Sequence, residues 1–398
     1  MKILFWMSIG FDRRTPSEHL LTAMVQALYE QGHTVHIIQK DTSGPLPKLP
    51  AQLEELGVTS RCIPSPTPRK NNLIGRYLAD IRYVFACRKY IRRKDGYGAA
   101  FLQSNNVAGF AMHMLKKRLP GIPVTFNVQD IFPYNAVFSG SLKAGSLPFK
   151  VLAKIQRYAY QKADRVITIS EDMRDLLIAD GAPEEKVEVI YNWSYRDTPY
   201  DPQEVDCTVA RKLFPAQTFN VVYAGNIGRM QNVDILLKTA ALMKDTEDVV
   251  FHILGDGAYK NKLEKFAREQ ALDNVVFHPM QSSDQAPALY MTADVNVIPL
   301  VKGVYRTALP SKTATCLACG KPIVFCIGKE AKFAQLAEKE AACICLDSDD
   351  PQALKDAVLA LRQENKPCNM AAFFTAHFSK TANSRRYAQL LVQSADKT

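Results

Sequence analysis

The sequence predicts an α/β fold made of two domains, and three observations predict it. Short apolar runs alternate with amphipathic helical segments along the chain, which is the pattern of parallel sheets covered by helices. A strand, a turn with glycine and a helix open each half, at residues 2–28 and 219–243. Between the halves, residues 194–218 are rich in polar residues without periodicity, as in a linker. A chain of 398 residues also exceeds the usual size of one core.

Charge is distributed unevenly along the chain. The formal net charge is +10. Residues 1–200 hold 27 Lys and Arg against 18 Asp and Glu, whereas the remainder holds 23 against 22. The first half therefore suits an anionic partner, such as phosphate groups or an anionic membrane surface. We expect no nucleic acid partner, because no aromatic stacking platform or helix-turn-helix pattern accompanies the charge.

Cysteine usage and hydropathy predict a cytoplasmic location. The nine cysteines are an odd number and lie mostly in apolar segments, which suits buried thiols in a reducing compartment. Cys316 and Cys319 form a CxxC pair, but no second pair or histidine stands at zinc spacing, so we expect no metal. No apolar run reaches the roughly 20 residues that cross a bilayer. The apolar start runs into Asp12 and Arg13 without a cleavage site and is expected to form a strand.

The first half is expected to hold several strands and helices in alternation. The strand at 2–7 leads into Gly10, a single glycine without the GxGxxG pattern, so a dinucleotide site is weakly supported. Ser17 and Ser170 are expected to cap helices. Asp130 follows the strand at 124–128, where parallel sheets place residues that handle ligands. The other predicted elements of this half are strands at 34–39, 99–103, 166–170 and 187–191 and helices at 18–28, 72–94, 140–165 and 171–178.

The segment 69–94 combines apolar and basic residues at helical spacing. Apolar residues recur from Ile74 to Phe85, and seven Lys and Arg stand between Arg76 and Lys94. Such a basic amphipathic helix is typical of proteins that lie on an anionic membrane surface. The alternative is a helix packed on the core with a solvated charged face. We expect a protein that is bound peripherally to the inner face of the plasma membrane.

The second half repeats the layered pattern. Strands are expected at 219–224, 249–254, 275–278, 295–299 and 323–325, and helices at 233–243, 351–363 and 382–392. The first strand leads into the turn Gly225-Asn226-Ile227-Gly228-Arg229, and the second into Gly255-Asp256-Gly257. Arg229 emerges at its turn, where the guanidinium fork is able to hold a phosphate.

A third turn, LPSKTATCLACGKPIV at residues 309–324, opens a short helix. Ser311 is expected to cap it, and Gly320 and Pro322 to end it. Free N–H groups, the helix dipole and Lys312 together make its start a candidate anion site.

Four motifs of the second half resemble the retaining glycosyltransferases of family 4, and most closely the subgroup that makes bacterial O-antigen, capsule and colanic acid polysaccharides. The motifs are AGNIGRMQNVDILLKTA, HILGDGAYKNKLE, ADVNVIPL and LPSKTATCLACGKPIV, in that order. The resemblance is clear over residues 219–326 and extends weakly to NVQDIFP and VIYNWS in the first half. It implies a GT-B fold, with two Rossmann-like domains facing each other across a cleft.

The resemblance also implies roles for residues. The N-terminal domain, 1–195, would bind the acceptor, with the helix 380–398 packing back on it, and the domain 205–378 would bind a UDP- or GDP-sugar donor. Neither a metal nor a cofactor is implied. Asp130 would lie near the sugar or the acceptor hydroxyl, and Arg229 and Lys312 would lie at the diphosphate. All three would be catalytic residues. Donor-binding residues would be Gly10, Asn226, Gly228, Arg229, Gly255, Asp256, Gly257, Pro310, Ser311, Lys312 and Thr315.

The chain departs from the family pattern at several of these positions. Thr307 and Thr315 stand where many members carry two glutamates, Gln231 replaces a frequent lysine, and Gln129 replaces a frequent histidine. The resemblance still implies transfer of a hexosyl or N-acetylhexosaminyl group, with retention, to a lipid-linked glycan acceptor. The alternatives are a non-catalytic partner subunit of the same fold and a sugar-nucleotide epimerase.

Overall fold

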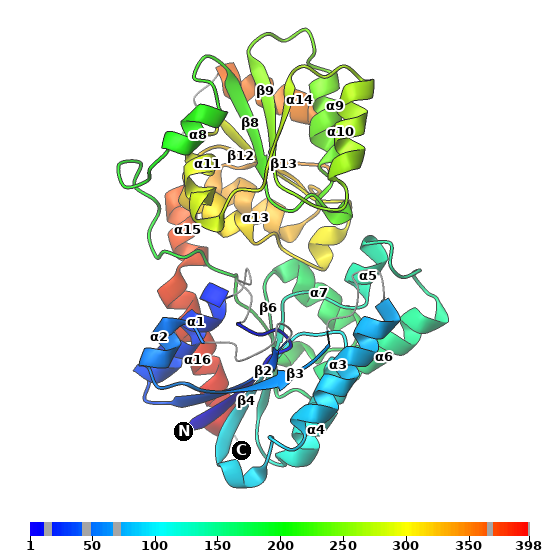
Figure 1. The fold of residues 1–398 in the computed structure, drawn as a ribbon, viewed down its shortest axis with the longest axis vertical. Coiled ribbons are helices and arrows are strands. Elements are labelled where there is room, and N and C mark those ends of the chain that lie inside the picture. Colours follow the sequence, from blue (N-terminus) through cyan, green and yellow to red (C-terminus); the bar gives the residue numbers. More distant parts are fainter. Residues whose placement is uncertain (12–17, 42–48, 67–72, 364–368, 397–398) are drawn as a thin grey trace. The chain divides into compact units, whose positions relative to one another are not determined.

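The computed structural model describes the chain except for residues 12–17, 42–48, 67–72, 364–368 and 397–398. The predicted cap Ser17 lies outside the described residues, as do the first residues of the segment 69–94. The chain forms two compact units (Figure 1). The N-terminal unit comprises Met1–Asn192 and Lys380–Thr398, and the C-terminal unit comprises Trp193–Ser379.

The N-terminal unit is built on a seven-stranded parallel sheet in the order β3-β2-β1-β4-β5-β6-β7. Its central strand β1 is buried from Ile3 to Trp6 because helices cover both faces, as is usual for parallel sheets. The strands are β1 (Lys2–Trp6), β2 (Thr34–Asp41), β3 (Thr59–Pro64), β4 (Tyr97–Gln103), β5 (Val124–Val128), β6 (Arg165–Thr168) and β7 (Val187–Val189).

Helices of this unit include one from the far end of the chain. Helix α16 packs on α1 and on β4, and its Tyr387 hydroxyl donates to Asn127 Oδ1 of β5 at 2.9 Å. The helices are α1 (Glu18–Glu30), α2 (Ala51–Glu55), α3 (Leu73–Cys87), α4 (Ala108–Arg118), α5 (Tyr134–Phe138), α6 (Leu147–Lys162), α7 (Glu171–Ala179) and α16 (Lys380–Asp396), with 3-10 turns at Arg93–Asp95 and Glu184–Lys186.

The C-terminal unit is built on a six-stranded parallel sheet in the order β10-β9-β8-β11-β12-β13. Its strands are β8 (Phe219–Ala224), β9 (Val249–Leu254), β10 (Val275–His278), β11 (Val295–Pro299), β12 (Ile323–Cys326) and β13 (Ile344–Leu346). Its helices are α8 (Thr208–Leu213), α9 (Asp234–Ala241), α10 (Lys260–Glu269), α11 (Ala286–Thr292), α12 (Lys312–Ala318), α13 (Lys332–Ala341), α14 (Pro351–Gln363) and α15 (Met370–Phe378), with 3-10 turns at Arg229–Gln231, Ser283–Gln285 and Val304–Arg306.

Two features of α3 correct the expectation for 72–94. The helix ends at Cys87, so Arg88 to Lys94 are not part of it. Its buried residues are Ala79, Tyr83, Val84 and Cys87, whereas Ile74, Leu78 and Phe85 are exposed. The predicted apolar stripe therefore splits into a face on the core and a separate exposed ridge.

Of three predicted helix-end signals, two are confirmed and one is wrong. Ser170 Oγ accepts from Met173 N at 3.2 Å and caps α7, and Gly320 has φ +69° just after α12. Ser311 does not cap α12: its backbone is itself helical (φ −59°, ψ −27°) and its side chain makes no capping bond. In the part of the chain that the structure describes, no helix is both long enough and apolar enough to cross a membrane.

Candidate functional site

The predicted site residues divide between the two units. Gly10 and Asp130 belong to the N-terminal unit, and all the others belong to the C-terminal unit. In the C-terminal unit, the structure brings together the turn after β8, the turn after β9 and the start of α12.

The turns after β8 and β9 pack backbone against backbone. Ile227 N donates to the Asp256 carbonyl at 2.8 Å, and Gly225 N donates to the Leu254 carbonyl at 2.9 Å. A Cβ atom on Gly255 would overlap the carbonyl oxygen of Gly225, and one on Gly257 would overlap that of Ile227. Both glycines also have φ +157°, so the close contact requires glycine at these positions.

Lys312 brings a cation to the first of these turns. Its Nζ lies 3.7 Å from the centroid of the Tyr223 ring, and a Cβ on Gly225 would lie 2.7 Å from it. Lys312 is partly exposed as a residue, but the Nζ atom itself is buried and makes no hydrogen bond to any residue that the structure describes. Loss of hydration lowers the pKa of Lys312 to about 8, against a smaller raising effect of Cys316. A buried cation without an anionic partner is the normal mark of a site for an anionic ligand.

The side chains at the rim of these turns are polar and mostly exposed. Asn226 Nδ2 donates to Gln231 Oε1 at 3.2 Å, so a neutral amide pair stands at this position. The exposed Arg229 side chain makes no hydrogen bond or ion pair to the described residues. The Asp256 carboxylate accepts from Gly257 N at 2.8 Å and thus shapes its own turn. Arg229 is therefore the second cation available at the turn after β8.

The start of α12 differs from the predicted capped helix. Thr313 N donates to the Pro310 carbonyl at 3.0 Å, and Ser311 is exposed. Thr315 lies one turn further along and is partly exposed. Thr307 is fully buried and donates to the Val304 carbonyl at 3.0 Å, so its hydroxyl is used within its own turn. Of the two threonines, only Thr315 is available to a ligand.

In the N-terminal unit, the predicted residues follow the central strands. Gly10 is buried in the loop after β1. Asp130 follows β5, is exposed, and makes no side-chain contact to a described residue that would neutralise it. Protein atoms crowded around the carboxyl raise the pKa of Asp130 to about 6 by reducing its hydration.

Comparison with known proteins identifies the family. A Glycosyl transferase 4-like domain matches residues 18–193, and a Glycosyl transferases group 1 domain matches residues 218–364. The chain belongs to glycosyltransferase family 4. WbjE of Pseudomonas aeruginosa, named as a glycosyltransferase, is 26% identical over 75% of this chain and 74% of its own length. WcaI of Escherichia coli K12, named for colanic acid biosynthesis, is 29% identical over 63% of this chain and 62% of its own length.

Solved structures show the same architecture. The structure of HepE from Anabaena in complex with UDP matches with a TM-score of 0.70 at 17% identity, over 99% of this chain and 100% of HepE. WaaG, a glycosyltransferase involved in lipopolysaccharide biosynthesis, matches with a TM-score of 0.64 at 14% identity, over 99% of each chain. The family 4 glycosyltransferase thus has the GT-B fold, with two Rossmann-like domains.

A network of amides in the glycosyltransferase accounts for one departure from the family pattern. Gln129 Nε2 donates to Asn127 Oδ1 at 2.9 Å, and Asn192 Nδ2 donates to Gln129 Oε1 at 2.6 Å. The Tyr387 hydroxyl donates to the same Asn127 oxygen. Gln129 therefore ties β5 to Asn192 through both ends of its carboxamide.

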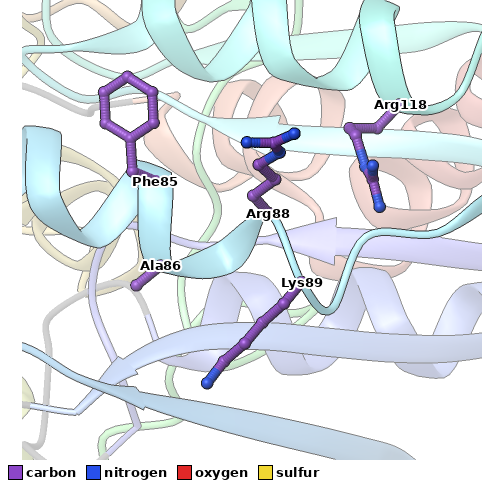
Figure 2. A pocket seen from close by; sticks show the side chains of 5 residues that line it. All are labelled: Phe85, Ala86, Arg88, Lys89 and Arg118. Carbon is purple, nitrogen blue, oxygen red and sulfur yellow. The ribbon is translucent and has the colours of Figure 1, made fainter.

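A basic hollow lies beside the end of α3. It has a volume of about 460 Å³ and is lined by Phe85, Ala86, Arg88, Lys89 and Arg118. Figure 2 shows the two arginines and Lys89 around the hollow and the Phe85 ring at its margin. The lining carries three positive charges and no acid. The sequence indicated the first four residues within 69–94 but not Arg118, which α4 contributes from another part of the chain.

Tyr223 is the site residue that the sequence analysis missed. It is buried at the carboxyl end of β8, and its hydroxyl donates to the Asn226 carbonyl at 2.5 Å. The available signal was a polar aromatic residue near the carboxyl end of a buried strand, two residues before the glycine turn.

Proposed function

We propose that this glycosyltransferase moves a sugar from a nucleoside diphosphate donor to a lipid-linked glycan, with retention of anomeric configuration, in bacterial surface polysaccharide biosynthesis. One observation carries the proposal: the buried Lys312 ammonium without an anionic partner, set against the glycine turns after β8 and β9. The relative WcaI, which is named for colanic acid biosynthesis, supports the biological setting.

The proposed reaction explains why cations are needed at these turns. Breaking the anomeric C–O bond leaves a nucleoside diphosphate, on which negative charge develops in the transition state. Fixed cations and N–H dipoles stabilise that charge without reorganisation. Lys312 and Arg229 would provide the charges, and Asn226 and Thr315 would provide polar contacts nearby. We propose that the residues at the turns fulfil this role without a metal ion.

The glycine turns suit a donor because they let backbone approach the ligand closely. At Gly225 and Gly228 a side chain would fill the space beside Lys312 Nζ and Gln231 Oε1, at 2.7 and 2.6 Å respectively. UDP is the first nucleotide to test, because HepE was solved with UDP. We would measure thermal stabilisation of the pure protein by UDP, GDP and dTDP and their sugars. Stabilisation by none of them, at millimolar concentration, would contradict the proposed donor site.

Asp130 is proposed to act on the sugar or the acceptor hydroxyl. Its exposed carboxylate must be ionised for this role, and its pKa of about 6 predicts that transfer falls as pH drops below that value. The Asp130→Asn variant should no longer show this decrease at low pH, and it should transfer sugar at least about tenfold more slowly, ~1.4 kcal/mol. Asp164→Asn is the control, since Asp164 pairs with Lys116 at the far end of β5. An unchanged pH profile in Asp130→Asn would remove Asp130 from the mechanism.

The exposed ridge of α3 and the basic hollow support a membrane-bound acceptor. Ile74, Leu78 and Phe85 are 76%, 48% and 58% exposed, and basic residues flank them. Such a surface suits a bilayer that contains anionic lipids. Flotation with liposomes containing phosphatidylglycerol should recover the protein at low salt and lose it with phosphatidylcholine alone. Binding that ignores both lipid charge and salt would favour a soluble acceptor.

A non-catalytic partner subunit is the second candidate, favoured by Thr307. This threonine stands where many family members carry a glutamate, and its hydroxyl is buried and satisfied within its own turn. Nucleotide-sugar binding without turnover on any lipid-linked acceptor would support this candidate over the enzyme.

A further inference from the structure

Tyr223 touches both the cation and the turn of the proposed donor site. We infer that Tyr223 is a positioning residue that fixes the Lys312 ammonium, through its ring face, and the turn after β8, through its hydroxyl, for binding of the donor diphosphate. The inference rests on the proposed function of this site and adds a residue to it.

The contact between Lys312 and the Tyr223 ring is the shortest of its kind among the described residues. Lys312 Nζ lies 3.7 Å from the ring centroid, whereas the six other contacts between a cation and a ring span 4.5 to 5.9 Å. Attraction to a ring face is strongest when the cation is close and shielded from water. Both conditions hold here, because Nζ and the ring are buried.

Lys40 offers a useful contrast within the same chain. Its Nζ also lies over a tyrosine ring, that of Tyr83, but at 5.9 Å, and it forms an ion pair with Asp80 at 2.6 Å. The charge of Lys40 is neutralised by the carboxylate. Lys312 has no such carboxylate among the described residues, so the ring stabilises the ammonium while its positive charge remains available to a ligand.

The hydroxyl of Tyr223 links this cation to the turn. It donates to the Asn226 carbonyl at 2.5 Å, in the segment between Gly225 and Gly228. Asn226 and Gly225 therefore keep their position relative to the ring, and the ring keeps its position relative to Lys312 Nζ. One side chain thus sets the distance between the cation and the backbone that approaches the ligand.

The ring and the hydroxyl can be tested separately with inorganic pyrophosphate and UDP as probes. Tyr223→Leu removes both, and Tyr223→Phe keeps the ring. Tyr290→Phe is the matched control, because Tyr290 is also buried beside the strand, donates to the Ala224 carbonyl at 3.4 Å, and makes no ring contact with Lys312. Binding constants are measured by calorimetry between pH 6.5 and 9.5.

The Tyr223 ring favours the charged form of Lys312, so removal of the ring should weaken pyrophosphate binding most near pH 8. In Tyr223→Leu we expect affinity for pyrophosphate to fall about fivefold or more, and the pH at which binding declines to move lower. Tyr223→Phe should keep that pH and weaken binding less, and Tyr290→Phe should match the wild type. A merely structural role would leave the pH dependence unchanged.

A second replacement keeps the test valid if Tyr223→Leu does not fold. Pentafluorophenylalanine at position 223 has the shape of phenylalanine, but its ring face no longer attracts cations. The inference is overturned if this replacement binds pyrophosphate as Tyr223→Phe does at every pH. If Lys312→Met also binds as the wild type does, the proposed diphosphate site itself fails. Loss of binding in Lys312→Met with no effect at position 223 overturns the role of Tyr223 alone.

Discussion

The turn after β1 in the N-terminal unit and the turn after β8 in the C-terminal unit both follow a buried central strand, but they are held in different ways. After β1, glutamine side chains hold the backbone: Gln103 Oε1 accepts from Ser8 N at 3.1 Å, and Gln39 Oε1 accepts from Phe11 N at 2.8 Å. After β8, the neighbouring glycine turn holds it through backbone contacts. N–H groups of both turns therefore donate within the protein, but the turn after β8 also lies beside a buried cation that has no hydrogen-bond partner among the described residues.

This difference explains why we place the diphosphate in the C-terminal unit. An anion gains most from donors and cations that have no partner within the protein. Lys312 and Arg229 meet this condition within the described part of the C-terminal unit. The N-terminal unit instead presents the exposed carboxylate of Asp130, which suits an acceptor hydroxyl better than a phosphate.

The largest expected effect tests the backbone contact between the two glycine turns. Gly255→Ala would force a methyl group into the Gly225 carbonyl and should lower the free energy of unfolding by about 3 kcal/mol or more. Gly320→Ala is the control, because Gly320 has positive φ but open space around it, and should cost only about 1 kcal/mol. Urea denaturation compares them. Equal losses would show that strain of the backbone, and not the contact between turns, requires Gly255.

The next effect tests the cation itself. Lys312→Ala should lower sugar transfer at least about tenfold, ~1.4 kcal/mol, because it removes the charge that we propose to face the leaving diphosphate. Lys321→Ala, beyond the other end of α12, should transfer normally. Steady-state kinetics with the donor found by thermal stabilisation gives the comparison. Near-normal turnover in purified Lys312→Ala would place the diphosphate elsewhere.

Arg229 should show a similar or smaller effect, of about tenfold in transfer, ~1.4 kcal/mol. Its side chain makes no contact that the fold needs, so Arg229→Ala should unfold at the temperature of the wild type. Arg211→Ala on α8, another exposed arginine, serves as the control for loss of charge. Equal rates of sugar transfer by Arg229→Ala and Arg211→Ala would leave Lys312 as the one cation assigned to the diphosphate.

The smallest effect concerns the stability of the free protein. The folded pKa of Lys312, about 8, lies below its ordinary value of 10.5, so between these pH values the unfolded chain binds more protons and stability rises with pH. Below pH 8, the buried ammonium lowers stability. Lys312→Met should therefore raise the free energy of unfolding at pH 7 by about 1 kcal/mol and the melting temperature by roughly 2 °C. The gain should disappear above pH 10.5; a melting temperature at pH 7 equal to or below that of the wild type would contradict the buried charge.

Much of the fold could be predicted because its signals are local. The strands β8, β9, β10 and β11 have the predicted bounds, since each is a short apolar run that ends at a turn or a polar residue. The prediction of one apolar stripe in the segment 72–94 was wrong, because the same alternation of apolar and basic residues fits a face on the core and a face toward solvent. Which face is buried depends on α4 and the sheet, and these contacts join residues far apart in the sequence.

The candidate site was predictable in part for the same reason. Glycine and lysine at turns mark backbone approach and charge, so Gly228, Gly255 and Lys312 could be proposed from the sequence. The sequence could not show that Lys312 Nζ is buried over Tyr223, because that contact joins a strand and a helix almost 90 residues apart. Ser311 was misassigned because a serine before a helix caps it only when its own backbone is extended, and here it is helical.

Helix α16 is the last element of the chain but belongs to the N-terminal unit, so this unit is completed only after the C-terminal unit has been translated. The C-terminal unit is complete once residue 379 has left the ribosome, whereas the N-terminal unit lacks the helix that covers α1 and β4 until residues 380–396 follow. Tyr387, Ala388 and Leu391 of this helix are fully buried, so their sites on the first sheet stay open to water until then. The part that is translated first is thus the part that is completed last.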